Sequence, residues 1–113
     1  MKTKERRDAL RLLGLARRGG GVVIGTDASR AALREGRARL VLVAGDASPV
    51  QVEKIKRLLT ERSVPQVILG DRGALGAAVG KGPVSVVAVT AAPMAAELAK
   101  RLGAKASPGP VEE

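Results

Sequence analysis

Residues 39–51 read Arg-Leu-Val-Leu-Val-Ala-Gly-Asp-Ala-Ser-Pro-Val-Gln, and this stretch decides the class of fold. Its first part, residues 39–44, is an almost continuous apolar run, which predicts a strand covered on both faces. In the second part, Ser48 is expected to cap a helix, with Pro49 at the first helical position and Gln51 completing a capping box. A buried strand that leads into a capped helix indicates an α/β protein.

The same alternation of helix and strand continues in both directions. Gly25 is expected to turn the chain before a second helix capped by Thr26 or Asp27, and Asp71 is expected to cap a fourth. Five helices interleaved with four strands predict a three-layer α/β/α sandwich, and their apolar strands favour a mainly parallel sheet. We expect helices at residues 3–18, 49–62, 72–79 and 93–102, a further helix from the cap at Thr26 or Asp27 to about residue 35, and strands at 22–24, 39–44, 66–69 and 84–89.

The chain of 113 residues is long enough for one domain, which we predict over residues 1–102. Residues 103–113 lack hydrophobic periodicity and are predicted to form a flexible tail. The sequence contains no Phe, Trp or Tyr, so the core must be built from aliphatic side chains.

Three absences restrict the function. Without Cys there is no disulfide or thiol nucleophile, and without His the commonest general base and metal ligand are missing. Without aromatic residues, the protein cannot stack nucleic-acid bases on aromatic rings. We therefore predict a protein that is not an enzyme and binds no metal and no organic cofactor.

The net charge of +9 favours a polyanionic partner, either a nucleic acid or an anionic membrane surface. Most of the excess lies in residues 1–39, which hold eleven Lys and Arg against four Asp and Glu. The longest stretch without charge, residues 82–96, is interrupted by proline and falls short of the ~20 apolar residues of a membrane span. Arginines interrupt any apolar signal core near the N-terminus, so the expected compartment is the cytoplasm.

A basic cluster is the positive functional signal. Arg30 and Arg34 are four residues apart, hence on one helix face, and the helix that follows Gly25 begins with free backbone N–H groups that attract phosphate. The guanidinium fork can contact two phosphate oxygens at once. Alternatively, these arginines only solvate an exposed helix face. The neighbouring turns are flanked by Arg17, Arg18, Arg37 and Arg39.

Two glycine-rich segments do not meet the requirements of phosphate-binding loops. Residues 19–21 follow a predicted helix and precede a strand, the reverse of the required order. Residues 76–82 read GAAVGKG, which has three residues between its glycines where a Walker A loop has four, and no Ser or Thr after Lys81. The acidic residues Asp46, Glu53 and Asp71 are explained as helix caps or surface charges.

Several segments, in this order, resemble the bacterial members of the L7Ae/L30e superfamily of kink-turn-binding ribosomal proteins, which also includes the Gadd45 proteins. The resemblance spans roughly residues 9–102 and implies an α/β/α sandwich around a four-stranded mixed sheet, in place of a mainly parallel one. The segments that carry it are LLGLARRGG at 12–20, Gly25-Thr26, LVLVA at 40–44 with Asp46-Ala47-Ser48, Val64-Pro65, LGAAVG at 75–80 and VVAVT at 86–90.

The resemblance also implies a function, which is binding of a kink-turn, a sharply bent RNA with tandem sheared G·A pairs. One surface would meet the G·A pairs and nearby backbone, and a second, the loop before the last strand, would cover an extruded nucleotide. The first consists of Gly25, Thr26, Asp27, Ala28, Arg30 and Ala31, with Arg34 and Arg37 as further RNA-binding candidates. The second consists of Gly80, Lys81, Gly82, Pro83, Val84 and Ser85.

The sequence departs from the family pattern in the first surface. Archaeal and eukaryotic members have Asn-Glu after Gly-Thr and then a Lys, where this chain has Asp27, Ala28 and Ala31. Asp27 accepts but does not donate, and alanine makes no polar side-chain contact, so Arg30 is expected to substitute for the Lys. The predicted function is therefore non-catalytic binding of structured RNA by a protein that is a monomer when free. The alternative is a protein-interaction module on the same scaffold.

Overall fold

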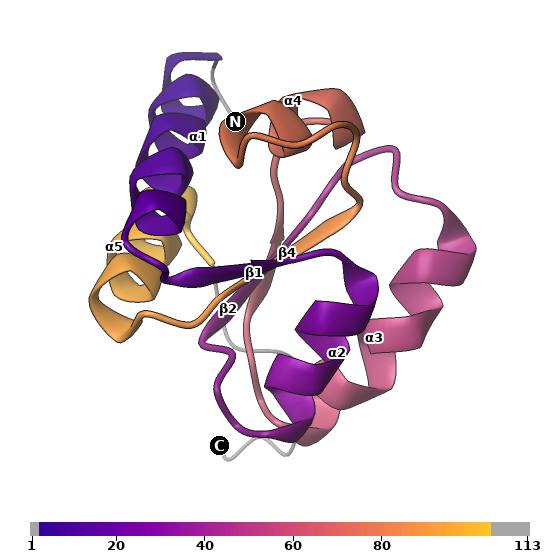
Figure 1. Cartoon of the computed structure of the whole chain (residues 1–113). Coiled ribbons are helices and arrows are strands. Elements are labelled where there is room, and N and C mark those ends of the chain that lie inside the picture. Colours follow the sequence, from indigo (N-terminus) through magenta and orange to yellow (C-terminus); the bar gives the residue numbers. More distant parts are fainter. Residues whose placement is uncertain (1–2, 105–113) are drawn as a thin grey trace.

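The computed structural model describes residues 3–104 and contains five helices and four strands in strict alternation (Figure 1). The predicted order of elements is confirmed, and most observed ends lie within one residue of those predicted. The elements are α1 Thr3–Arg18, β1 Val22–Ile24, α2 Thr26–Arg34, β2 Leu40–Val43, α3 Pro49–Glu61, β3 Gln66–Ile68, α4 Arg72–Ala78, β4 Val86–Val89 and α5 Ala92–Leu102.

The sheet is mixed, with strand order β1-β4-β2-β3. Only β2 and β3 run parallel, while β4 lies antiparallel between β1 and β2. The expectation of a mainly parallel sheet, drawn from the alternation of elements, is therefore wrong. The alternation of strands and helices along the chain does not specify whether neighbouring strands run parallel or antiparallel. Here the last strand enters the middle of the sheet from the opposite end.

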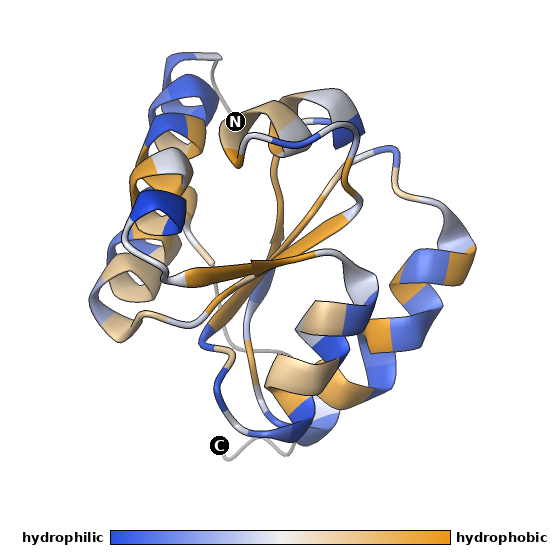
Figure 2. Ribbon diagram, in the orientation of Figure 1, coloured by the Kyte–Doolittle hydropathy of each residue, from blue (hydrophilic) through white to orange (hydrophobic). Residues whose placement is uncertain are grey.

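Helices cover both faces of the sheet and create two apolar layers. Leu40 and Leu42 of β2 point into a core with α1, α4 and α5, while Val41 and Val43 point into a second core with α2 and α3. All four residues of β2 are buried, which confirms the prediction of a strand covered on both faces. Figure 2 shows the hydrophobic strands between helices whose outer sides are largely hydrophilic. The three-layer α/β/α sandwich is thus the observed fold.

Strand β3 is an edge strand with one uncovered face. Val67 packs against the first core, whereas Gln66 and Ile68 are exposed, Ile68 to 63%. The parallel crossover through α3 places that helix over β2 and against α2, and it leaves the outer face of β3 open.

Two of the three predicted helix caps are confirmed. The Ser48 hydroxyl accepts the Gln51 amide at 3.3 Å, and Asp71 Oδ1 accepts the Ala74 amide at 2.8 Å. The prediction that Thr26 or Asp27 caps α2 is wrong, because the N-cap is Gly25. Gly25 has φ 101° and ψ 160°, a conformation that favours glycine, and it allows the helix to begin directly at Thr26.

The last helix ends at Gly103, which adopts the left-handed conformation with φ 65°. The Ala104 amide then donates to the Ala99 carbonyl at 2.9 Å. The predicted flexible tail falls almost entirely on residues 105–113, which lie outside the described residues, so it stays a prediction.

Candidate nucleic-acid interface

One end of the sheet gathers four loops. Strands β1, β2 and β3 end there and β4 begins there, because β4 is antiparallel to β1 and β2. We call this region the loop edge, and it consists of residues 25–28, 44–48, 69–72 and 80–85. Both surfaces implied by the family resemblance contribute to it.

Backbone hydrogen bonds hold these loops together. The Gly25 amide donates to the Val86 carbonyl at 2.8 Å, which ties the start of α2 to the end of the loop 80–85. The Ala44 amide donates to the Ser85 carbonyl at 2.9 Å. Segments that are far apart in the chain therefore form one continuous surface.

Asp46 and Arg72 connect the remaining loops. The Arg72 amide donates to Asp46 Oδ1 at 2.8 Å, and its Nε lies 3.4 Å from Oδ2. The Arg72 carbonyl in turn accepts the Val84 amide at 3.1 Å. The backbone hydrogen bond from Arg72, and secondly its guanidinium, lowers the pKa of Asp46 below its ordinary value. Asp46 thus binds the first amide of α4, a helix that is not the next one along the chain.

The start of α2 presents unpaired backbone donors. The first intrahelical bond runs from the Ser29 amide to the Gly25 carbonyl at 3.0 Å, so the amides of Thr26, Asp27 and Ala28 have no acceptor within the helix. Asp27 and Ala28 are exposed and Thr26 is half-buried. These amides can bind a phosphate or the edge of a base, whereas the Asp27 carboxylate repels phosphate.

The loop 80–85 is positioned by the end of α4. The Lys81 amide donates to the Gly76 carbonyl at 2.8 Å, and Gly80 adopts φ 73°. Gly76 touches this loop so closely that a Cβ there would overlap the carbonyl of Gly82. Lys81, Gly82 and Pro83 are exposed, while Val84 and Ser85 are half-buried. The loop therefore offers one cation and a flat, mostly apolar surface.

Arg17 belongs to the same region, although the sequence analysis placed it only beside the neighbouring turns. Its guanidinium carbon lies 3.8 Å from the position that a Cβ on Gly80 would occupy. Arg17 is exposed and forms no ion pair among residues 3–104. Only the packing of α1 against α4 creates this proximity, so no local sequence signal could have indicated it.

Arg30 and Arg34 face α3 as well as solvent. They line a groove of ≈ 440 Å³ between α2 and α3. Arg30 is half-buried, and its Nε is buried without a hydrogen-bond partner among the described residues. Arg34 is exposed, and its carbonyl accepts the Arg62 guanidinium at 2.6 Å. The wall formed by α3 contributes Glu53, Lys54, Arg57, Leu58 and Glu61.

The structure brings most, but not all, of the predicted residues together. Arg30 and Ala31 lie on the flank of α2, beyond its first turn. Arg34 is the last residue of α2, and Arg37 follows it and pairs with Glu35 at 2.7 Å. Both lie away from the loop edge, towards the end of the sheet where Arg39 bonds Val89. The predicted residues that lie at the loop edge are Gly25, Thr26, Asp27, Ala28, Gly80, Lys81, Gly82, Pro83, Val84 and Ser85.

Residues 3–104 contain no group of three acidic, His or Cys side chains that could hold a metal ion. In the same part of the chain, no helix is long and apolar enough to cross a membrane.

The family model described as "Ribosomal protein L7Ae/L30e/S12e/Gadd45 family" matches residues 7–99. The chain belongs to this family. The match includes most of α1, all of α2, α3 and α4, every strand and most of α5, and so it includes the whole loop edge.

Three individual proteins of known name or structure are similar to this L7Ae-family chain. The RNA-binding protein YlxQ of Bacillus subtilis (strain 168) is 40% identical over 79 residues, which cover 70% of this chain and 79% of YlxQ. A protein of unknown function from Bacillus halodurans C superimposes with a TM-score of 0.80 at 29% identity, covering 84% of this chain and 96% of that one. The Giardia lamblia 15.5kD RNA binding protein superimposes with a TM-score of 0.77 at 21% identity, covering 91% of each chain, and this likeness concerns the fold.

Proposed function

We propose that this protein binds structured RNA through the loop edge, without catalysing a reaction, as a ribosomal-protein-like accessory factor. The observation that carries the proposal is the hydrogen bond from the Gly25 amide to the Val86 carbonyl, which joins the two surfaces that the family uses for RNA. The family membership and the name of the YlxQ relative support the same class of ligand.

The RNA we propose is a kink-turn or a related bent element. A sharp bend crowds phosphates, and cations lie on two sides of the loop edge, with Arg17 and Lys81 at the loop 80–85 and Arg30 on the flank of α2. Such a surface stabilises the bent conformer over the straight one, because only the bent conformer presents several phosphates to it at once. The loop 80–85 would cover an extruded nucleotide with Gly82 and Pro83.

The departures from the family pattern affect how the RNA is contacted. Asp27, Ala28 and Ala31 provide no side-chain donor, so backbone amides must make the contacts to the G·A pairs. Arg30 supplies a positive charge one position before Ala31. Its Nε is buried and lacks a hydrogen-bond partner among the described residues.

A filter-binding titration tests the proposal. Native protein is titrated with a kinked RNA and with a straight duplex of equal length at two salt concentrations. We expect tighter binding of the kinked RNA at both concentrations, and a loss of affinity for both RNAs as salt rises. Equal affinities would refute the preference for bent RNA, and no binding at either concentration would favour the protein-interaction alternative.

Further properties follow from the same proposal. We propose a cytoplasmic protein with no metal and no organic cofactor, which is a monomer when free of RNA. Light scattering that gives a dimer mass independent of dilution would contradict the monomer, and elemental analysis with stoichiometric metal would contradict the metal-free state.

A further inference from the structure

The outward face of α1 carries a row of cations. Lys4, Arg7, Arg11 and Arg18 recur at intervals of three, four and seven residues, so they lie on one face of the helix. All four are exposed, and the opposite face buries Ala9, Leu13 and Ala16 in the core. We call these four residues the α1 stripe.

Among the described residues, the cations of the α1 stripe have no acidic partner, unlike several cations elsewhere. Elsewhere, cations such as Arg57 and Arg101 pair with acidic side chains at 2.9 and 2.8 Å. Within residues 3–104, no ion pair involves a member of the stripe. Of the acidic residues of α1, Glu5 is turned about 100° around the helix axis from Lys4. Asp8 lies four residues after Lys4 and three before Arg11, yet it forms no ion pair with either among the described residues.

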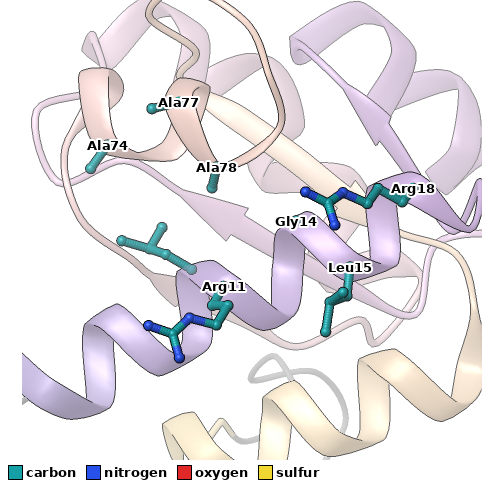
Figure 3. A pocket seen from close by; sticks show the side chains of 8 residues that line it. Arg11, Gly14, Leu15, Arg18, Ala74, Ala77 and Ala78 are labelled. Atoms are coloured by element: carbon teal, nitrogen blue, oxygen red, sulfur yellow. The ribbon is translucent and has the colours of Figure 1, made fainter.

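An open groove borders the stripe. It separates α1 from α4, measures ≈ 480 Å³ and has Arg11 and Arg18 on its rim (Figure 3). Leu15, which is 51% exposed, and small residues of α4 form its apolar part. Gly14 permits this close packing, because a Cβ there would lie 3.0 Å from the Ala78 carbonyl oxygen. The groove therefore places two guanidinium groups beside a shallow surface that a ribose edge can contact.

The stripe extends away from the loop edge. It runs along the helix for about 21 Å from Arg18 to Lys4. Arg17 points towards the loop 80–85, but it is one residue, or about 100°, around the helix from Arg18. In addition, α1 packs on the opposite face of the sheet from α2 and α3. An RNA bound at the loop edge thus leaves most of the stripe uncovered.

We propose that the α1 stripe is a second RNA-binding surface, which takes the phosphate backbone of a duplex. Double-stranded DNA carries about one negative charge per 1.7 Å when both strands are counted, and an RNA duplex is similarly dense, so several phosphates of a duplex lie within the length of about 21 Å that the row of cations spans. An acidic protein partner would need an apolar anchor, and the groove offers only one exposed leucine among alanines. The protein then connects two duplex segments, one at the loop edge and one along α1.

The inference predicts a complex with two RNAs. Native protein saturated with kinked RNA is titrated with a labelled short straight duplex, and its capture is followed by fluorescence anisotropy. We expect capture whose affinity falls about 40-fold between 50 and 200 mM salt if Arg7, Arg11 and Arg18 each contact one phosphate. The variant Arg7→Gln/Arg11→Gln/Arg18→Gln should capture the duplex at least tenfold more weakly while keeping its affinity for kinked RNA within a few-fold.

A matched control removes three charges from another exposed helix. The variant Lys54→Gln/Lys56→Gln/Arg57→Gln on α3 should capture the second duplex as native protein does. Circular dichroism of both variants checks that they are folded. The duplex on the α1 stripe could be a stem of the bound kinked RNA or a separate RNA molecule, and a kinked RNA with one lengthened stem distinguishes the two. If the stem reaches the stripe, lengthening it should raise the affinity of native protein for the kinked RNA but leave the affinity of the α1 variant unchanged.

Several outcomes would overturn the proposal. These are equal capture by native protein and the α1 variant, displacement of kinked RNA by the straight duplex, or occupation of the stripe by an acidic helical peptide in place of RNA. The test also separates this proposal from the proposed function. If kinked and straight RNA bind equally, the proposed preference for kinked RNA is refuted. The proposal for the α1 stripe would still predict that native protein binds two short duplexes where the α1 variant binds one.

Discussion

Replacement of Gly76 by alanine should disturb both the fold and the loop 80–85. The new methyl group would overlap the carbonyl of Gly82, which is backbone and cannot rotate away. Either α4 moves away from the loop, or the loop moves away from α4. Because the Lys81 amide also bonds to the Gly76 carbonyl, a shift of the loop strains that bond as well.

The expected cost is the difference between two opposing effects. Insertion of a methyl group into a packed site costs about 1–3 kcal/mol, while alanine favours a helix over glycine by up to about 1 kcal/mol. The net destabilisation should be about 1–2 kcal/mol, or a fall in Tm of about 4–15 °C for a domain of this size. Gly73→Ala is a matched control in the same helix, because its Cβ would lie 3.5 Å from the nearest atom, Asp71 Oδ1. It should leave Tm unchanged or raise it slightly.

The assay is thermal unfolding of native protein and both variants, followed by RNA titration at a temperature where all three are folded. Gly76→Ala should weaken binding of kinked RNA more than binding of a straight duplex, since the displaced loop no longer covers the bend. If Gly76→Ala and Gly73→Ala melt at the same temperature, or if Gly76→Ala binds kinked RNA as native protein does, the reasoning about this loop is refuted.

Three further perturbations test the loop edge. Arg30→Ala should reduce RNA affinity and make the slope of log affinity against log salt shallower by about one unit or slightly less. Arg34→Ala should have a smaller effect, because Arg34 lies farther from the loop edge. Unchanged slopes for both folded variants would argue that these arginines only line the groove. Thr26→Leu should lower the ratio of kinked to straight RNA affinity, since Thr26 begins the α2 turn, and an unchanged ratio would place the bend elsewhere. Asp46→Asn should lower the Tm above about pH 4, and the difference in Tm between this variant and native protein should shrink as the pH falls further. The reason is that a carboxylate with a lowered pKa stabilises the fold only while it is ionised. A difference in Tm that is constant with pH would contradict the Asp46–Arg72 link.

Local signals predicted the elements because each is marked within a few residues. The capping sequence at Ser48, the amphipathic pattern of α1 and the continuous apolar run of β2 depend only on near neighbours. The N-cap of α2 was predicted one or two positions too late, because the cap is a glycine whose amide is held by a distant strand.

The arrangement of strands and loops could not be predicted from such signals. The antiparallel insertion of β4 between β1 and β2 joins strands more than 40 residues apart, and no local pattern encodes it. The resemblance to the family indicated a mixed sheet where periodicity did not. The link between Asp46 and Arg72, and the approach of Arg17 to Gly80, arise only from packing of separate elements.

Amide chemical-shift mapping by NMR shows directly whether the loop edge contacts RNA. Isotope-labelled native protein is titrated with kinked RNA, and the shift of every backbone amide is followed. The account predicts the largest shifts at Thr26, Asp27, Ala28, Lys81 and Gly82, and small shifts at Arg37 and Ser63 beyond the opposite end of the sheet. Large shifts confined to the opposite end, with residues 25–28 and 81–85 unaffected, would contradict it.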